Sequence, residues 1–283
     1  MMGGITDMQQ SENARRAWVP YLILIPITLP IVMMYTWLFV SSFSTGMQGI
    51  IPQGFTLDNW RFLWETKQGA ASIWAYAVNT FLFAACVTVV ELLVASLAAY
   101  AISRLNFPGR RLFLSFVIIL HAFPSITLII AIFFILRMLG LYDTLTGVIV
   151  VKVAFELPFA IWIMKGFFDN VPWDLEIAAM VDGASRWNVW RKVVMPVVRP
   201  GLAALAVFAF LTGWSEFMIP FLFAPNSSTQ TLSVFLNMLT SQADEANYGL
   251  VTAVGLFYIL PVLIFYALTQ KYLLNIFSGG VKG

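Results

Sequence analysis

The stretch VPYLILIPITLPIVMMYTWLFVSSF, residues 19–43, decides the fold class of this chain. It contains no charged side chain, and about 20 apolar residues suffice for a helix to cross the roughly 30 Å hydrocarbon core of a bilayer. Residues 1–18 before it are polar and include Arg15 and Arg16. A secretory signal would have an apolar core of only about 7–15 residues, followed by a cleavage site. The stretch is therefore predicted to be a retained first transmembrane helix.

Apolar runs of similar length recur along the rest of the chain. They predict five further spans, at residues 76–103, 112–136, 144–164, 202–223 and 250–272. Apolar residues make up 60% of the chain and charged residues 11%, against about 25% charged residues in soluble domains. Strands of a membrane barrel would instead alternate in pieces of about ten residues. We expect an all-α polytopic membrane protein, with a transmembrane domain over residues 19–277 and a tail over 278–283.

The distribution of lysine and arginine predicts the orientation in the membrane, because basic loops stay in the cytoplasm. With the N-terminus inside, the outer segments contain only Arg61, Lys67 and Arg137, and Lys152 lies within a span. All the other basic residues then fall on the cytoplasmic side: Arg15, Arg16, Arg104, Arg110, Arg111, Lys165, Arg186, Arg191, Lys192, Arg199, Lys271 and Lys282. Both termini and the 278–283 tail are thus predicted to be cytoplasmic.

The composition also argues against several classes of function. A net charge of +2 is too small to suggest nucleic-acid binding. One cysteine, Cys86, and one histidine, His121, cannot supply the three or four ligands of a zinc site. No lysine follows a glycine, so the chain has no P-loop, and G-x-S-x-G is absent. We expect His121 to pack between helices rather than to catalyse, and an intramembrane enzyme is disfavoured.

Residues 166–200 form the longest segment predicted on the cytoplasmic side, and their pattern indicates two short helices. Pro172 suits a first helical turn, and Gly183 is placed to end that helix in a left-handed conformation. Ser185 can cap a second helix, expected to end at Pro196. The mixture of apolar and charged residues predicts a helix pair that contacts a soluble partner. An amphipathic connector that rests among lipid headgroups is the alternative.

Four ionisable residues lie inside the predicted spans: Glu91, Lys152, Glu156 and Glu216. A charge at the bilayer centre costs roughly 3 kcal/mol, so each should face other helices or water. Lys152 and Glu156 are one helical turn apart and are predicted to neutralise each other, with Glu216 bordering the same polar region. One interpretation is a polar wall along a transport path. The other is a local ion pair or a tether between helices, which is favoured for Glu91.

The helix pair resembles the signature loop of ATP-binding-cassette (ABC) importer permeases. The family pattern is E-A-A, three residues, G, nine residues, then I-x-L-P. Here it is matched by Ala178 and Ala179, Gly183, and residues 193–196. The family glutamate position is Ile177, and the acid is Glu176, one residue earlier. The resemblance implies that the ATPase-coupling residues are Glu176, Ala178, Ala179, Asp182, Gly183 and Pro196.

Other stretches are similar to the smaller, six-helix permease of the maltose and trehalose type, in the carbohydrate-uptake class. They include Asn79 and Thr80, residues 99–104 with 107–110, residues 140–144, 157–160 and 166–168, residues 214–217, and the ending 278–283. These stretches occur in the family order and at the expected depths, and the resemblance covers nearly the whole chain after residue 19.

The resemblance implies an alternating-access importer in a bacterial or archaeal cytoplasmic membrane. Its partners would be a second permease subunit, two ATPase subunits that bind ATP and Mg²⁺, and an external sugar-binding protein, besides membrane lipid. This chain would hold no cofactor and no catalytic site. Gly280 and Lys282 of the tail would contact the ATPase. The external segment 237–248 would contact the binding protein through Asn237, Gln242, Asn247 and Tyr248.

Two questions stay open from the sequence. A disaccharide or short oligosaccharide is the first substrate hypothesis, and polyols or glycerol phosphates come next. A self-sufficient secondary transporter, in which Lys152, Glu156 and Glu91 relay protons, is the competing mechanism. Copurification with a nucleotide-binding subunit separates this mechanism from the importer.

Overall fold

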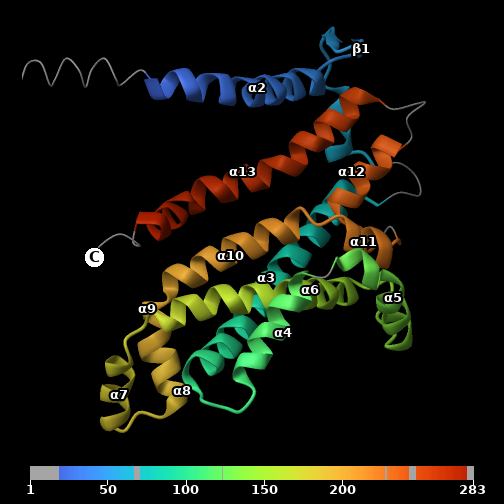
Figure 1. Cartoon of the computed structure of the whole chain (residues 1–283). Helices are drawn as coiled ribbons and strands as arrows, with labels where there is room; N and C mark the ends of the chain where they lie inside the picture. Colours follow the sequence, from blue (N-terminus) through green and yellow to red (C-terminus); the bar gives the residue numbers. More distant parts are fainter. Residues whose placement is uncertain (1–18, 67–70, 123, 227, 242–246, 279–283) are drawn as a thin grey trace, which may run out of the picture. The chain divides into compact units, whose positions relative to one another are not determined.

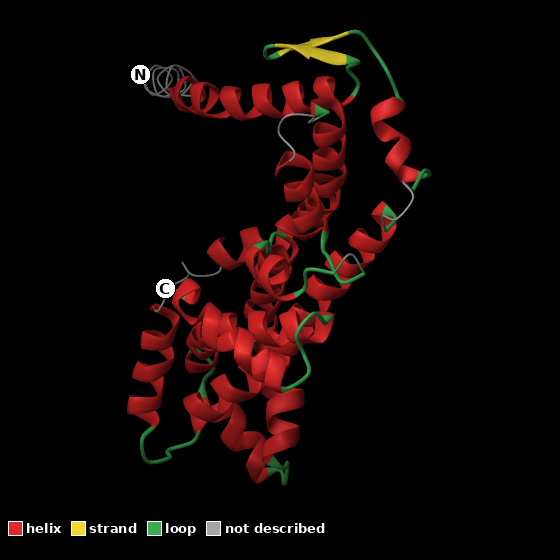
Figure 2. Ribbon diagram, turned by 90° about the vertical axis from the view of Figure 1, so that its right-hand side faces the viewer, coloured by secondary structure: helices red, strands yellow, loops and turns green. Residues whose placement is uncertain are grey.

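The computed structural model describes residues 19–66, 71–122, 124–226, 228–241 and 247–278. The chain forms two compact units: Met1–Arg61 with Gln242–Phe257, and Phe62–Ser241 with Tyr258–Gly283. Within the described ranges, the fold is helical apart from one short hairpin (Figures 1 and 2). In these ranges, four helices are long and apolar enough to cross a membrane, and up to six spans result if each bent helix pair counts as one. The predicted all-α membrane fold is confirmed.

The first unit contains α2 (Val19–Ser42), the hairpin of β1 (Gly46–Gln48) and β2 (Ile51–Gln53), and the start of α13 (Tyr248–Ser278). The apolar side chains of α2 are exposed along the helix, as suits a lipid environment. The strands pair antiparallel. The buried Asn59, in the 3₁₀ turn η1 (Asp58–Leu63), donates to the carbonyls of Ser42 at 3.1 Å and Ser44 at 2.8 Å, which holds the chain after α2.

The core of the second unit is formed by α3 (Ile73–Arg104), α6 (Leu145–Asp169) and α10 (Arg199–Trp214), which pack along one another (Figure 1). Ser72 caps α3 and Thr144 caps α6. A Cβ at Gly213 would lie 3.0 Å from the Cα of Ala84. Small residues at such a crossing let two helix backbones approach closely, which stabilises helix packing inside a membrane.

The third predicted span, residues 112–136, is not one helix. It consists of α4 (Arg110–Ala122), a 3₁₀ turn η2 (Ser125–Leu128) and α5 (Ile129–Met138). Pro124 lies at the break, and proline lacks an N–H and clashes with the preceding helical turn. The stretch predicted as one span is therefore two helices with a bend between them, and by length and composition the pair can still count as one span.

The fifth predicted span, residues 202–223, is also interrupted. α10 ends at Trp214 and α11 (Met218–Phe223) follows after three residues. The carboxylate of Glu216 accepts a hydrogen bond from the backbone N–H of Ile219 at 3.1 Å, at the start of α11. Because an acid at a helix N-terminus satisfies unpaired donors, the break places this charged residue where it is stabilised.

The segment after α11, expected to be an external loop, contains the helix α12 (Leu232–Ser241) packed on α3. Asn79 Nδ2 donates to the carbonyls of Ser228 at 2.9 Å and Gln230 at 3.0 Å. Thr80 Oγ1 accepts from Leu232 N–H at 2.8 Å. The two polar residues that open the second span therefore hold this connection at the end of the bundle.

Candidate functional site

The first helix of the predicted pair, α7 (Trp173–Val181), ends as its sequence indicates. Gly183 has a φ of +87°. Its N–H donates to Met180 O, and the N–H of Ala184 donates to Ala179 O, both at 3.0 Å. These two bonds define a Schellman motif, in which glycine adopts the left-handed conformation at little steric cost. The sequence prediction of a glycine stop at this position is confirmed.

The second helix of the pair runs through α8 (Arg186–Asn188), the π-helical η3 (Val189–Val194) and α9 (Met195–Val197). Ser185 caps its start by accepting from Asn188 N–H at 3.4 Å. The helix was expected to end at Pro196, and it continues to Val197 instead. In the π segment, Met195 N–H bonds to Trp190 O, five residues back. This wider turn relieves the clash that a proline makes with the carbonyl four residues before it.

The two faces of α7 differ in character. Ile177 and Val181 are 50% and 80% exposed, and Ala178 and Asp182 are also at the surface. Glu176 is only 2% exposed. Its carboxylate accepts from Arg104 Nε at 2.5 Å and from the Tyr100 hydroxyl at 3.0 Å. The acid that the resemblance assigns to the ATPase contact therefore points into its own chain, an arrangement that sequence spacing did not reveal.

The intramembrane ionisable residues form one cluster in the second unit. Lys152 Nζ lies 2.7 Å from Glu156 Oε1 and 2.6 Å from Glu216 Oε2. The Thr212 hydroxyl donates to the second oxygen of Glu156 at 3.1 Å. Glu91 is buried and interacts electrostatically with Glu156 and Lys152. The i,i+4 pair inferred from the sequence is present, and Glu216 is a second partner of the same lysine.

A cavity of about 320 Å³ opens beside this cluster. Lys152, Glu156 and Glu216 lie on one part of its wall. The rest is mostly apolar and includes His121, whose ring stacks on Phe159 with centroids 5.3 Å apart. Among the described residues no group of three His, Cys, Asp or Glu side chains is arranged for a metal. The charged residues of the lining can form hydrogen bonds with a bound molecule, and the apolar residues can pack against it.

The other predicted contact residues belong to different elements. Asn237 is half-buried in α12, and Tyr248 is exposed at the start of α13. Asn247 caps α13, with its side-chain oxygen accepting from Leu250 N–H at 3.1 Å. Gln242, Gly280 and Lys282 lie outside the described residues.

Membrane-crossing helices, a charged cluster with a cavity inside the bundle, and a capped helix pair at one end define a membrane component of a transporter. The chain belongs to the family described as "Binding-protein-dependent transport system inner membrane component", whose model matches residues 91–273. It is thus a multi-pass inner-membrane permease of the ABC transporter class. Such permeases are transport components without catalytic activity or a cofactor of their own.

Named relatives match across most of their lengths. The trehalose transport system permease protein SugB of Mycobacterium tuberculosis is 32% identical over 83% of this chain and 85% of its own. The diacetylchitobiose uptake system permease protein NgcG of Streptomyces coelicolor is 32% identical over 95% and 90%. A solved structure of a bacterial ABC transporter involved in the import of the acidic polysaccharide alginate contains a chain of the same fold. Its TM-score is 0.78 at 22% identity, covering 92% of this chain and 97% of that one.

Proposed function

We propose that this chain is the permease subunit of an ATP-driven carbohydrate importer, with a disaccharide or short oligosaccharide as cargo. Relatives at 32% identity are named for transport of trehalose and uptake of diacetylchitobiose, both built from two sugar units. The chain would work beside a second permease subunit, two ATPase subunits and an external binding protein. Both of its termini would face the cytoplasm of a bacterium or archaeon.

The observation that carries this proposal is the exposed face of α7. A short helix with a fixed stop at Gly183 presents Ile177 and Val181 to its surroundings. Exposed apolar residues on a rigid, protruding element are typical of a protein contact. This face would fit a groove of one ATPase subunit, and closure of the ATPase pair would move the helix as a rigid body.

The cavity beside Lys152 would belong to the cargo path. Its volume of about 320 Å³ is within the range of small-molecule sites. The Glu156 and Glu216 carboxylates can accept hydrogen bonds from sugar hydroxyls, while Lys152 offsets their charge within the membrane. Glu91, buried in α3, would tether helices behind this wall.

Contacts at the two membrane surfaces complete the proposal. On the outside, Asn237, Gln242, Asn247 and Tyr248 would contact the sugar-binding protein. On the inside, Gly280 and Lys282 of the tail would contact the ATPase pair. These roles follow from the family resemblance and from the predicted orientation.

A pair of matched charge insertions tests the docking surface. Val181 and Met138, at the ends of α7 and α5, are both 80% exposed. Val181→Glu should reduce copurification of the ATPase subunits and abolish binding-protein-stimulated ATP hydrolysis. Met138→Glu, predicted on the outer side, should leave both unchanged. Equal effects of the two substitutions would exclude α7 as the ATPase contact.

The cargo is tested on the complete complex in proteoliposomes. ATP hydrolysis is measured with the binding protein and with each of several disaccharides, short oligosaccharides, polyols and glycerol phosphates. Stimulation by a disaccharide or oligosaccharide supports the proposal, and stimulation only by a polyol or a glycerol phosphate replaces it. Substrate uptake without any ATPase subunit would instead support the secondary-transporter mechanism.

A further inference from the structure

The end of α3 and the start of α7 are joined by a buried polar network that no catalytic or cargo role explains. Arg104, in the last turn of α3, uses its guanidinium on three acceptors. They are Glu176 Oε1 at 2.5 Å, Val171 O at 2.7 Å and Ser103 Oγ at 3.3 Å. The same guanidinium carbon lies 4.7 Å from the ring centroid of Trp173. The Arg104 side chain thus contacts a residue before α7, the first residue of α7 and a residue one turn into that helix.

Both carboxylate oxygens of Glu176 accept hydrogen bonds in this network. One carboxylate oxygen accepts from Arg104 and the other from the Tyr100 hydroxyl. The side chains of Arg104 and Glu176 are 3% and 2% exposed. A buried ion pair is seldom more stabilising than apolar packing of the same volume, because both charges lose their hydration. What such a pair does supply is a fixed geometry, since a planar guanidinium bonds its acceptors in set directions.

The neighbouring helix end is tied into the same junction. The Ser103 hydroxyl donates to Asp169 Oδ1 at 2.6 Å, and Lys165 forms an ion pair with the other oxygen of Asp169. Asp169 is the last residue of α6. The ends of α3 and α6 are thereby joined one residue from Arg104, which itself contacts α7.

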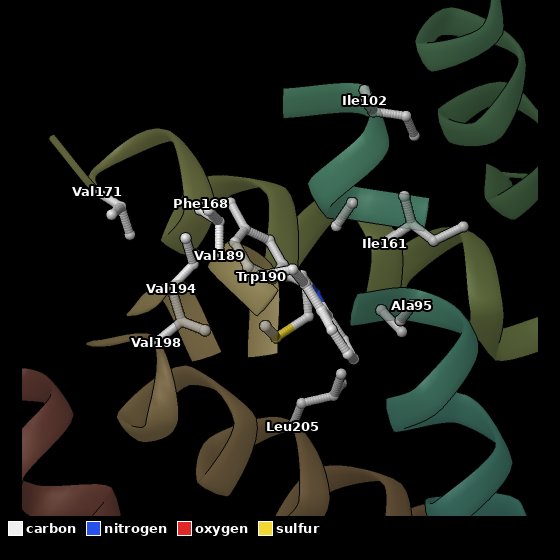
Figure 3. Close-up of a cluster of buried hydrophobic side chains, with 13 residues drawn as sticks. Ala95, Ile102, Ile161, Phe168, Val171, Val189, Trp190, Val194, Val198 and Leu205 are labelled. Carbon is white, nitrogen blue, oxygen red and sulfur yellow. The ribbon is translucent and has the colours of Figure 1, made fainter. Parts of the chain in front are cut away.

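The second helix of the pair is attached to the same bundle by apolar packing. Val189, Trp190, Val194 and Val198 lie in one buried cluster with residues of three long helices (Figure 3). In that cluster Ala95 and Ile102 come from α3, Ile161 and Phe168 from α6, and Leu205 from α10. Both helices of the pair are therefore fixed to α3 and α6, one through a polar junction and the other through an apolar one.

We propose that Arg104 and Glu176 are positioning residues that transmit movement of α7 to α3 and α6. Glu176 acts inward, on Arg104 and Tyr100, while the exposed face with Ile177 and Val181 receives the ATPase. The inference rests on the proposed ATPase docking at α7. A loose junction would let α7 follow the ATPase while α3 stays in place, so ATP would be hydrolysed without import.

The test uses the complete complex in proteoliposomes and measures sugar taken up per ATP hydrolysed. Glu176→Gln removes the charge with little change of shape. It should keep the ATPase subunits bound and lower the uptake ratio about 5- to 150-fold, the range of typical coupling between sites. Asp174→Asn is the matched control, because Asp174 is an exposed acid on the same helix. It should leave the ratio unchanged.

A double variant separates positioning from simple stabilisation. Arg104→Met with Glu176→Met replaces the ion pair by apolar packing, which commonly preserves or raises stability. If the pair transmits movement, the double variant should assemble and have wild-type thermal stability while its uptake ratio stays low. Recovery of the ratio to the wild-type value would show a merely structural pair and overturn the proposal.

Other results of these experiments also test the positioning role of Glu176. Loss of ATPase copurification in Glu176→Gln alone, with normal thermal stability, would mean that Glu176 contributes to docking, and it would overturn the inward role. If that variant does not assemble and is unstable, Tyr100→Phe removes one bond to Glu176, and an unchanged ratio in Tyr100→Phe would refute the link. Failure of the proposed function would instead appear in the wild-type complex, as absence of bound ATPase subunits.

Discussion

Lys152 shows how far local spacing predicts a site in this protein. Its pairing with Glu156 follows from their separation by one helical turn, and the ion pair is present. Its second partner, Glu216, lies 64 positions away in the sequence. The residues of the Arg104–Glu176 pair are 72 positions apart. No periodicity encodes such contacts, because they depend on how the helices pack. The sequence identified Lys152, Glu156 and Glu216 as charges that need partners in the membrane and placed them in one polar region, but it assigned an ion pair only to the two residues on one helix.

A double-mutant cycle tests the Lys152 cluster at the residue scale. Lys152→Met leaves two carboxylates without their cation, and breaking a buried pair costs roughly 3–5 kcal/mol. We expect a lower thermal unfolding midpoint and lower uptake. Adding Glu156→Gln should recover part of the loss, and adding Glu216→Gln more, with an interaction free energy above about 0.5 kcal/mol.

Thr212→Ala is the control for this cycle, since it leaves all charges in place and removes the hydroxyl that donates to Glu156 and to the Ala209 carbonyl. We expect a change of about 1 kcal/mol or less. Strict additivity of the Lys152 and Glu156 substitutions would mean that the two side chains do not interact. If the triple variant is stable yet does not import, the cluster belongs to the cargo path. If it imports normally, the cluster is structural.

At the element scale, helix ends were predicted better than helix breaks. Gly183 and Ser185 carry local signals, a residue suited to positive φ and a capping hydroxyl, and both act as expected. The breaks before Ser125 and after Trp214 were missed, because hydropathy stays high across them and a proline within a span is ambiguous. The proline at the first break and the charged Glu216 at the second were the available signals.

The helix stop between α7 and α8 can be tested by one substitution. Gly183→Val forces a branched residue into the left-handed region, which costs about 1–2 kcal/mol. Nothing lies within 4 Å of an added Cβ, so the substitution acts through backbone strain rather than through a clash at that atom. We expect normal membrane insertion with reduced ATPase binding and uptake.

Gly166→Val is the matched control for that substitution. Gly166 also has open space around its Cβ position, but it lies inside α6 without a positive φ. It should retain most of the uptake of the wild-type complex. Wild-type uptake and sugar-stimulated ATP hydrolysis in Gly183→Val would show that the left-handed stop is not needed for coupling.

At the scale of the whole molecule, hydropathy and charge together predicted the class of protein. Apolar runs of 20 residues or more with few or no charges are rare in soluble domains, so the membrane fold followed from their length and hydropathy. The interrupted spans could not be predicted in the same way. The second break, for example, is stabilised by the hydrogen bond from the N–H of Ile219, at the start of α11, to the Glu216 carboxylate at 3.1 Å.

The predicted orientation can be tested with single cysteines in a Cys86→Ser background. Gln48, in the exposed hairpin, is predicted outside and Asn188, in α8, is predicted inside. In intact cells a membrane-impermeant maleimide should label Gln48→Cys strongly and Asn188→Cys only at background, because the basic residues around Asn188 resist translocation. Permeabilised cells are the control, in which both should react. Labelling of Asn188→Cys in intact cells would place the helix pair outside, where no ATPase could bind it, and the proposed coupling would be lost with the orientation.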